Sequence, residues 1–182
     1  MKAVITGASS GIGKELVLHL LSSGGWEVCM VSRSTEKMQE IASQYPSEAS
    51  HIITADLSDN AQSEQACADI LTWADGNLSL LVNNAGAGIK GSTLANSSIE
   101  QFESQIRLNL TAVFIFTKLL SPLLAATASR AQASDLKYSG SIVNIGSIAA
   151  VGQNSISPSL SVFSFSLSLS LSLLLLFLII YV

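Results

Sequence analysis

A stretch rich in glycine and serine, TGASSGIG at residues 6–13, separates an apolar run from a helix-like run near the start of the chain. Glycine allows the backbone to turn sharply and a ligand to approach it closely, and a following helix N-terminus offers N–H groups and a partial positive charge. These properties suit a pyrophosphate. The candidate phosphate-binding residues are Gly7, Ser9, Ser10, Gly11, Ile12 and Gly13. A glycine-rich turn without a ligand is the alternative, because the spacing differs from the commoner Gly-x-Gly-x-x-Gly.

An arginine follows the next apolar run, at a position that can distinguish between dinucleotides. In dinucleotide-binding folds an acidic residue about twenty residues after the glycines binds the ribose 2′-OH, whereas an arginine there favours a 2′-phosphate. This chain has Ser32-Arg33-Ser34 at that point, and the next acidic residue is Glu36. A guanidinium can hold a phosphate through two parallel hydrogen bonds. The sequence therefore predicts NADP rather than NAD as the cofactor, with a solvated loop arginine as the alternative interpretation of Arg33.

Apolar runs of strand length alternate with runs of helical spacing along most of the chain. Strands are expected over residues 2–6, 26–32, 51–57, 78–86 and 141–147, and helices over 12–21, 35–44, 61–74 and 97–128. Strands with continuous apolar cores that are separated by helices indicate parallel βαβ units, and right-handed crossovers then give a doubly wound sheet. We expect an α/β fold with a doubly wound parallel sheet of the Rossmann type, incomplete at its C-terminal side.

One run, LNLTAVFIFTKLLSPLLAA at residues 108–126, is apolar enough to be mistaken for a membrane helix. Lys118 and Pro122 interrupt it, and a helix that is buried against a sheet is apolar on most of its sides. We therefore favour a helix buried within the domain over a membrane span.

Four stretches together resemble the short-chain dehydrogenase/reductase family. They are TGASSGIG, TADLSD around Asp56, NNAG at residues 83–86, and the pair LNLTAVF and SIVNIGS. Their order and approximate spacing match the family over about residues 2–153. The resemblance implies that Asp56, with Leu57 beside it, contacts the adenine of the cofactor and that Asn83 braces the central sheet. The residues that would line the cofactor ribose are Asn84, Ala85 and Gly86.

The same resemblance assigns catalytic roles to two residues and shows that the family's proton-donating pair is missing from this sequence. Asn109 matches the family asparagine that holds a helix kink and a proton-relay water, and Ser147 matches the serine that hydrogen-bonds the substrate carbonyl. The family's proton donor is the tyrosine of a Tyr-x-x-x-Lys pair. No lysine stands at that spacing after any tyrosine of this chain, namely Tyr45, Tyr138 and Tyr181. A serine hydroxyl is far less acidic than a phenol of pKa about 10 and cannot replace it, so we expect this chain to be catalytically inactive.

The last part of the chain differs in composition from the rest. The whole chain has 9 Lys and Arg against 13 Asp and Glu, a net charge of −4, but residues 138–182 carry no charged side chain. We expect an NADP-binding domain at 1–153 and a Ser/Leu-rich hydrophobic tail at 154–182 that looks foreign to it. The tail has three interpretations: a membrane anchor over 160–182, a strand over the alternating residues 166–172, or a segment outside the evolved domain. We favour the third, because a translated CT repeat gives LSLSLS, as in a retained intron or a misplaced exon boundary.

These features limit the function, partners and location that we expect. Without the later strands of the family, the strand at 141–147 would be an exposed apolar edge, so we expect self-association through 141–182. The sequence has no basic patch, and His19 and His51 have no partners at ligand spacing, so we expect neither a nucleic-acid partner nor a metal. By family, the expected function is a cytoplasmic NADP(H)-dependent oxidoreductase acting on a small carbonyl or alcohol. The alternative is a catalytically dead dinucleotide-binding module, anchored to a membrane by its tail.

Overall fold

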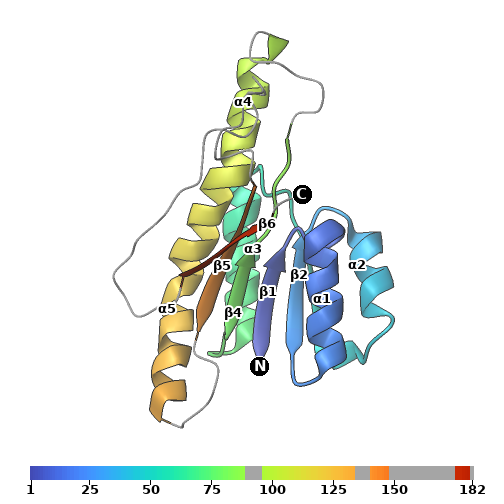
Figure 1. Ribbon diagram of the computed structural model, residues 1–182, viewed down its shortest axis with the longest axis vertical. Helices are drawn as coiled ribbons and strands as arrows, with labels where there is room; N and C mark the ends of the chain where they lie inside the picture. Colours follow the sequence, from blue (N-terminus) through green and yellow to red (C-terminus); the bar gives the residue numbers. More distant parts are fainter. Residues whose placement is uncertain (89–95, 134–139, 148–174, 181–182) are drawn as a thin grey trace.

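The computed structural model describes residues 1–88, 96–133, 140–147 and 175–180 (Figure 1). Its strands form one parallel sheet in the order β3-β2-β1-β4-β5-β6. The strands are β1 Lys2–Thr6, β2 Glu27–Ser32, β3 Ser50–Thr54, β4 Leu80–Asn83, β5 Ser141–Ser147 and β6 Leu175–Ile180. The α-helices are α1 Gly11–Ser23, α2 Thr35–Ala42, α3 Asn60–Ala74, α4 Ile99–Ile106 and α5 Ala112–Ala133. The predicted α/β class with a doubly wound parallel sheet is confirmed.

Both faces of the sheet are covered, because successive side chains of a strand point to opposite sides. In β1, Val4 packs into the apolar cluster that contains residues of α3 and α5, whereas Ile5 packs into the cluster that contains residues of α1 and α2. Leu81 and Val82 of β4 divide between the two clusters in the same way. Figure 1 shows α1 and α2 beside β1 and β2, with α3 behind the sheet. The continuous apolar runs of the sequence are therefore strands buried on both faces.

The chain reverses its direction of travel across the sheet after β3. Strands β1, β2 and β3 build outward on one side, and α3 then returns the chain so that β4 pairs with the other side of β1. In open α/β sheets such a reversal leaves a crevice at the carboxyl ends of the strands, where ligands bind. Strands β1 and β4 end here at Thr6 and Asn83. The glycine turn at 6–13 and the NNAG segment at 83–86 therefore meet at this crevice.

A long helical segment consists of α4, a π-helical turn at Arg107–Thr111, and α5, and its α5 part covers one face of the sheet. By length and apolar composition alone, residues Ile99–Ala131 could cross a membrane. One side of α5 is nevertheless buried with α3 and the sheet, through Ala112, Phe116, Leu120 and Leu124. Intervals of four residues keep these side chains on one helix face. One side of the run at 108–126 is thus buried within the domain, while Phe114 and Leu119 on the same run are exposed.

The C-terminal segment supplies a sixth strand. β6, with the sequence LLFLII, pairs in parallel with β5 from Leu175 opposite Ile142 to Ile180 opposite Ser147. The expectation that β5 would be an uncovered edge is therefore wrong, because the backbone of β6 pairs with it. β6 is also a strand where the membrane-anchor interpretation requires a helix. The alternating residues 166–172 lie outside the described residues.

Two glycines of the β5 segment allow a test of how closely β5 and α5 pack. A Cβ added at Gly140 would collide with the backbone carbonyl of Leu124 in α5, whereas one added at Gly146 meets no described atom within 4 Å. We expect Gly140→Ala to lower the free energy of unfolding by about 1–3 kcal/mol, because helix backbone must move to relieve the overlap. Gly146→Ala should change it by less than about 0.5 kcal/mol.

Urea unfolding followed by the fluorescence of Trp26 and Trp73 measures both variants. Equal free energies of unfolding for Gly140→Ala and the wild type would contradict the close approach of Gly140 to the backbone carbonyl of Leu124.

Candidate functional site

The glycine turn and the NNAG segment are in direct contact, and two glycines make this contact possible. Gly7 has a left-handed backbone, with φ of 67°, and a Cβ there would lie 2.9 Å from both Cα of Ala85 and Nδ2 of Asn84. A Cβ at Gly13 would lie 2.5 Å from the same Nδ2 atom and would also strike the carbonyl oxygen of Gly7. Real Cβ atoms do not approach other atoms this closely, so both positions require glycine.

Thr6, at the end of β1, joins the two segments by hydrogen bonds. Its Oγ1 accepts from the backbone N–H groups of Asn84 and Ala85, each at 3.0 Å, and donates to the carbonyl of Val82 at 3.4 Å. In return, Nδ2 of Asn84 donates to the carbonyl oxygens of Thr6 at 2.9 Å and Gly7 at 3.3 Å. The amide of Asn84 is therefore directed at the glycine turn. No pattern in the sequence marks Thr6 as part of the site, although it is the residue directly before the first glycine.

The start of α1 leaves room for an anion. Ser10 is the N-cap residue with an extended backbone, and in the part of the chain that the structure describes its side chain forms no cap hydrogen bond to α1. Gly11 has φ of 53°, and a Cβ there would meet none of the described atoms within 4 Å. Ile12 is 37% exposed. The N–H groups of a first helical turn have no partner within their own helix, so this uncapped, open turn fits the phosphates of a dinucleotide.

The ends of β2 and β3 bring together a second group of polar residues beside the glycine turn. The hydroxyls of Ser9 and Ser32 are 2.8 Å apart, which ties the turn to the end of β2. The next residue, Arg33, lies with its Nη1 3.8 Å from Oδ2 of Asp56, which follows β3. Leu57, in contrast, is 4% exposed and belongs to the core cluster. The structure therefore places Arg33 and Asp56 together at the crevice and turns the Leu57 side chain inward.

The carboxylate of Asp56 is held in its ionised form. Partial burial raises the pKa of Asp56, but hydrogen bonds from the backbone and hydroxyl of Ser58, together with the charge of Arg33, outweigh it and bring the pKa below its usual value. Oδ1 accepts from Ser58 N at 3.0 Å and from Ser58 Oγ at 2.7 Å. The other oxygen, Oδ2, is the one that faces Arg33.

Asn109 lies on the π-helical turn and holds the segment that follows NNAG. Its Oδ1 accepts from Ala87 N at 3.1 Å, and its Nδ2 donates to Ala87 O at 3.0 Å and to Oε1 of Gln105 at 3.1 Å. A Cβ at Gly86 would lie 3.1 Å from Asn109 Oδ1, so a side chain at Gly86 would press on this contact. A π-helical turn is rare and is found frequently at functional sites. The side chain of Asn109 therefore joins the helix to the segment that follows β4 by hydrogen bonds.

Ser147 is the last residue of β5, and its backbone pairs with Ile180 of β6. The register places Asn83 of β4 opposite Asn144 of β5. Nδ2 of Asn83, a buried residue, donates to Oδ1 of Asn144 at 2.8 Å and to Oγ1 of Thr117 at 3.2 Å. This amide links two strands and α5 beside the crevice.

Among the described residues, no group of three or more His, Cys, Asp and Glu side chains could hold a metal ion.

Comparison with known proteins gives consistent matches. A family model described as short chain dehydrogenase matches residues 1–161. A tropinone reductase homologue of Arabidopsis thaliana is 31% identical over 153 residues, which are 83% of this chain and 53% of that protein. The chain spans about half the length of the curated relatives it matches.

Solved structures resemble this one closely. A metagenomic short-chain oxidoreductase in complex with NADP has a TM-score of 0.73 at 27% identity, and the match covers 87% of this chain and 66% of that one. The 3-ketoacyl-(acyl-carrier-protein) reductase of Brucella melitensis complexed with NADH has a TM-score of 0.68 at 28% identity, covering 83% and 58%. From its fold, its glycine turn, its NNAG segment and these matches, the chain belongs to the short-chain dehydrogenase/reductase family.

Proposed function

We propose that this chain binds NADP(H) in the crevice where β1 and β4 end, as the cofactor-binding part of an oxidoreductase. The observation that carries the proposal is the contact of Gly7 and Gly13 with Asn84, which shapes the crevice, combined with Arg33 at the end of β2. Two structural relatives support a nicotinamide cofactor, because one was solved with NADP and the other with NADH. Arg33 is the reason to prefer NADP for this chain, since a guanidinium matches a 2′-phosphate.

Each part of the cofactor has candidate residues at the crevice. The pyrophosphate would lie on the uncapped start of α1, near Ser9, Ser10, Gly11 and Ile12. The 2′-phosphate would bind Arg33. The adenine would lie beside Asp56 and the backbone of Leu57. The segment Asn84, Ala85 and Gly86 would line the ribose through its backbone, because the Asn84 amide is engaged with the glycine turn. When bound, the nicotinamide carries a hydride to or from a carbonyl or alcohol carbon.

The residues of this chain can position a substrate but do not supply a proton. We propose that Ser147 hydrogen-bonds the substrate carbonyl and that Asn109 fixes the helix beside it through Ala87. General acid–base catalysis needs a group whose pKa lies near the working pH. The sequence holds no Tyr-x-x-x-Lys pair that would provide one. The 182-residue chain would therefore bind the cofactor and not turn over a substrate, and a longer product with that pair would act on a small carbonyl or alcohol.

We further propose a domain at 1–153 that carries the cofactor site and a tail at 154–182 that does not. Free thiols at Cys29 and Cys67, both buried in the core, are compatible with the reducing cytoplasm. A membrane contact through residues 160–182 is the alternative. Among the described strands, β6 stands at the edge of the sheet, where its backbone groups could pair with another chain, which supports self-association through this strand.

The preference for NADP can be tested by calorimetric titration with NADPH and NADH. We expect NADPH to bind more tightly, and Arg33→Ala to weaken NADPH binding about tenfold or more while changing NADH binding less than twofold, because charge-assisted hydrogen bonds to the 2′-phosphate are lost. Lys118→Ala removes the same charge from α5 and should leave both affinities unchanged. Tighter binding of NADH by the wild type would contradict the proposal.

Catalytic competence can be tested by following NADPH oxidation at the nicotinamide absorbance, with a panel of aldehydes and ketones. We expect the rate to equal the background rate without protein, because the sequence holds no Tyr-x-x-x-Lys pair to supply the proton. Calorimetry on the same preparation provides the control that the cofactor binds. Turnover above background by the chain of 182 residues would show that another group supplies the proton.

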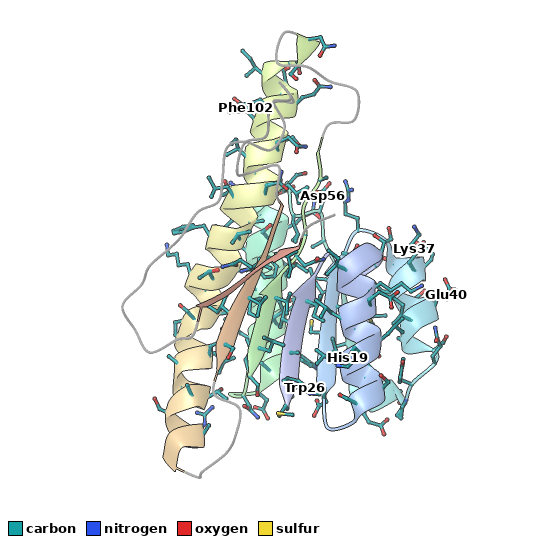
Figure 2. All side chains as sticks on the ribbon, viewed as in Figure 1. His19, Trp26, Lys37, Glu40, Asp56 and Phe102 are labelled. Atoms are coloured by element: carbon teal, nitrogen blue, oxygen red, sulfur yellow. The ribbon has the colours of Figure 1, made fainter. Side chains whose placement is uncertain are left out.

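Self-association through β6 can be tested by sedimentation velocity. A lysine on an edge strand opposes pairing with another strand, so Phe177→Lys should shift the protein towards the monomer. Phe102→Lys is the matched control, since Phe102 is 49% exposed on α4, which projects away from the sheet (Figure 2). Dissociation by Phe102→Lys alone would assign the interface to the helices and contradict the β6 edge.

A further inference from the structure

The two oxygens of Asp56 have different partners, and this division carries an inference beyond adenine contact. Oδ1 accepts two hydrogen bonds from Ser58, at 3.0 and 2.7 Å, while Oδ2 faces Nη1 of Arg33 at 3.8 Å. In the described part of the chain no other ion pair holds Arg33, whose side chain is 69% exposed against 38% for Asp56. Figure 2 shows Asp56 at the carboxyl end of the sheet.

The carboxylate is the fixed member of this pair, because its loop is held on several sides. The backbone N–H of Asp56 donates to Oε1 of Gln62 at 2.9 Å. Arg107, on the π-helical turn, donates through Nε to the carbonyl of Ser58 at 3.0 Å. Asp59 caps α3 by accepting from Ala61 N at 2.8 Å. A guanidinium that turned towards another anion would therefore lengthen its 3.8 Å contact with Asp56, because the loop holds the carboxylate in place.

We propose that Asp56 is a positioning residue that competes with the nucleotide 2′-phosphate for Arg33 and thereby limits how strongly the site prefers phosphorylated over unphosphorylated adenosine nucleotides. This inference rests on the proposed function. A carboxylate and a phosphate are both acceptors for the guanidinium fork, and they repel each other when they approach it together. An adenosine ligand without the 2′-phosphate leaves the Arg33–Asp56 contact intact and experiences no competition.

The test compares 2′,5′-ADP with 5′-AMP, which differ by the 2′-phosphate alone and do not involve the nicotinamide. The quantity measured is the ratio of their dissociation constants, by calorimetry on the full chain. Asp56→Asn keeps the shape and the acceptor for Ser58 but removes the charge. Loss of an adenine contact would weaken both ligands equally and cancel in the ratio. We expect the preference for 2′,5′-ADP to rise about two- to fivefold, the range of an exposed ion pair.

Two controls separate competition at Arg33 from a general effect of charge. Asp59→Asn removes the same charge from the same loop without a contact to Arg33 and should leave the ratio unchanged. In an Arg33→Ala background, Asp56→Asn should change the ratio of dissociation constants by less than half as much, because the guanidinium for which the carboxylate and the phosphate compete is absent. Far-UV circular dichroism verifies that each variant is folded.

The outcomes distinguish the inference from the proposed function. A preference that stays constant or falls in Asp56→Asn, or that rises equally in Asp59→Asn, overturns the competition and leaves NADP binding intact. An effect of equal size with and without Arg33 also overturns it, because the carboxylate then acts through space on the phosphate. Failure of the wild type to bind either nucleotide overturns the inference together with the proposed function.

Discussion

The architecture of the site depends on one hydroxyl group, that of Thr6. A threonine hydroxyl has one donor and two acceptor positions, and here all three are used, by the carbonyl of Val82 and the N–H groups of Asn84 and Ala85. Thr6 is buried, so an unmatched partner would be costly. This hydroxyl fixes the distance between the glycine turn and the end of β4, and thus the walls of the crevice.

A second constraint operates on the other side of the crevice, through the π-helical turn. Arg107 reaches the loop after β3 by its contact with Ser58, and Asn109 reaches the end of β4 by its contacts with Ala87. One turn of helix thus holds two loops that follow different strands. The loop after β3 and the segment after β4 are therefore positioned by the same element.

The sequence predicted the sheet well, because the strand runs are apolar on both faces and the glycine turn marks the boundary between the first strand and the first helix. It did not predict the role of Thr6, since its two amide partners come from a segment 78 and 79 positions later in the chain and no local pattern announces them. Nor does LLFLII reveal that β6 is a strand, because a short continuous apolar run has no period that separates strand from helix. The family resemblance assigned Asn84 to the ribose but could not indicate that its amide is directed into the glycine turn.

The π-helical turn also restricts how the gene can vary in length. Such a turn accommodates an extra residue within the surrounding helix, and each residue of an α-helix advances the chain by about 100° around its axis. The widened turn takes up the rotation that the extra residue would otherwise add, so deleting a single codon between Arg107 and Thr111 would restore regular winding and leave α4 in phase with α5. The deletion would remove the widened turn from which Arg107 and Asn109 reach the two loops. Insertions and deletions that a surface loop would absorb are therefore incompatible with the cofactor crevice at this point of the chain.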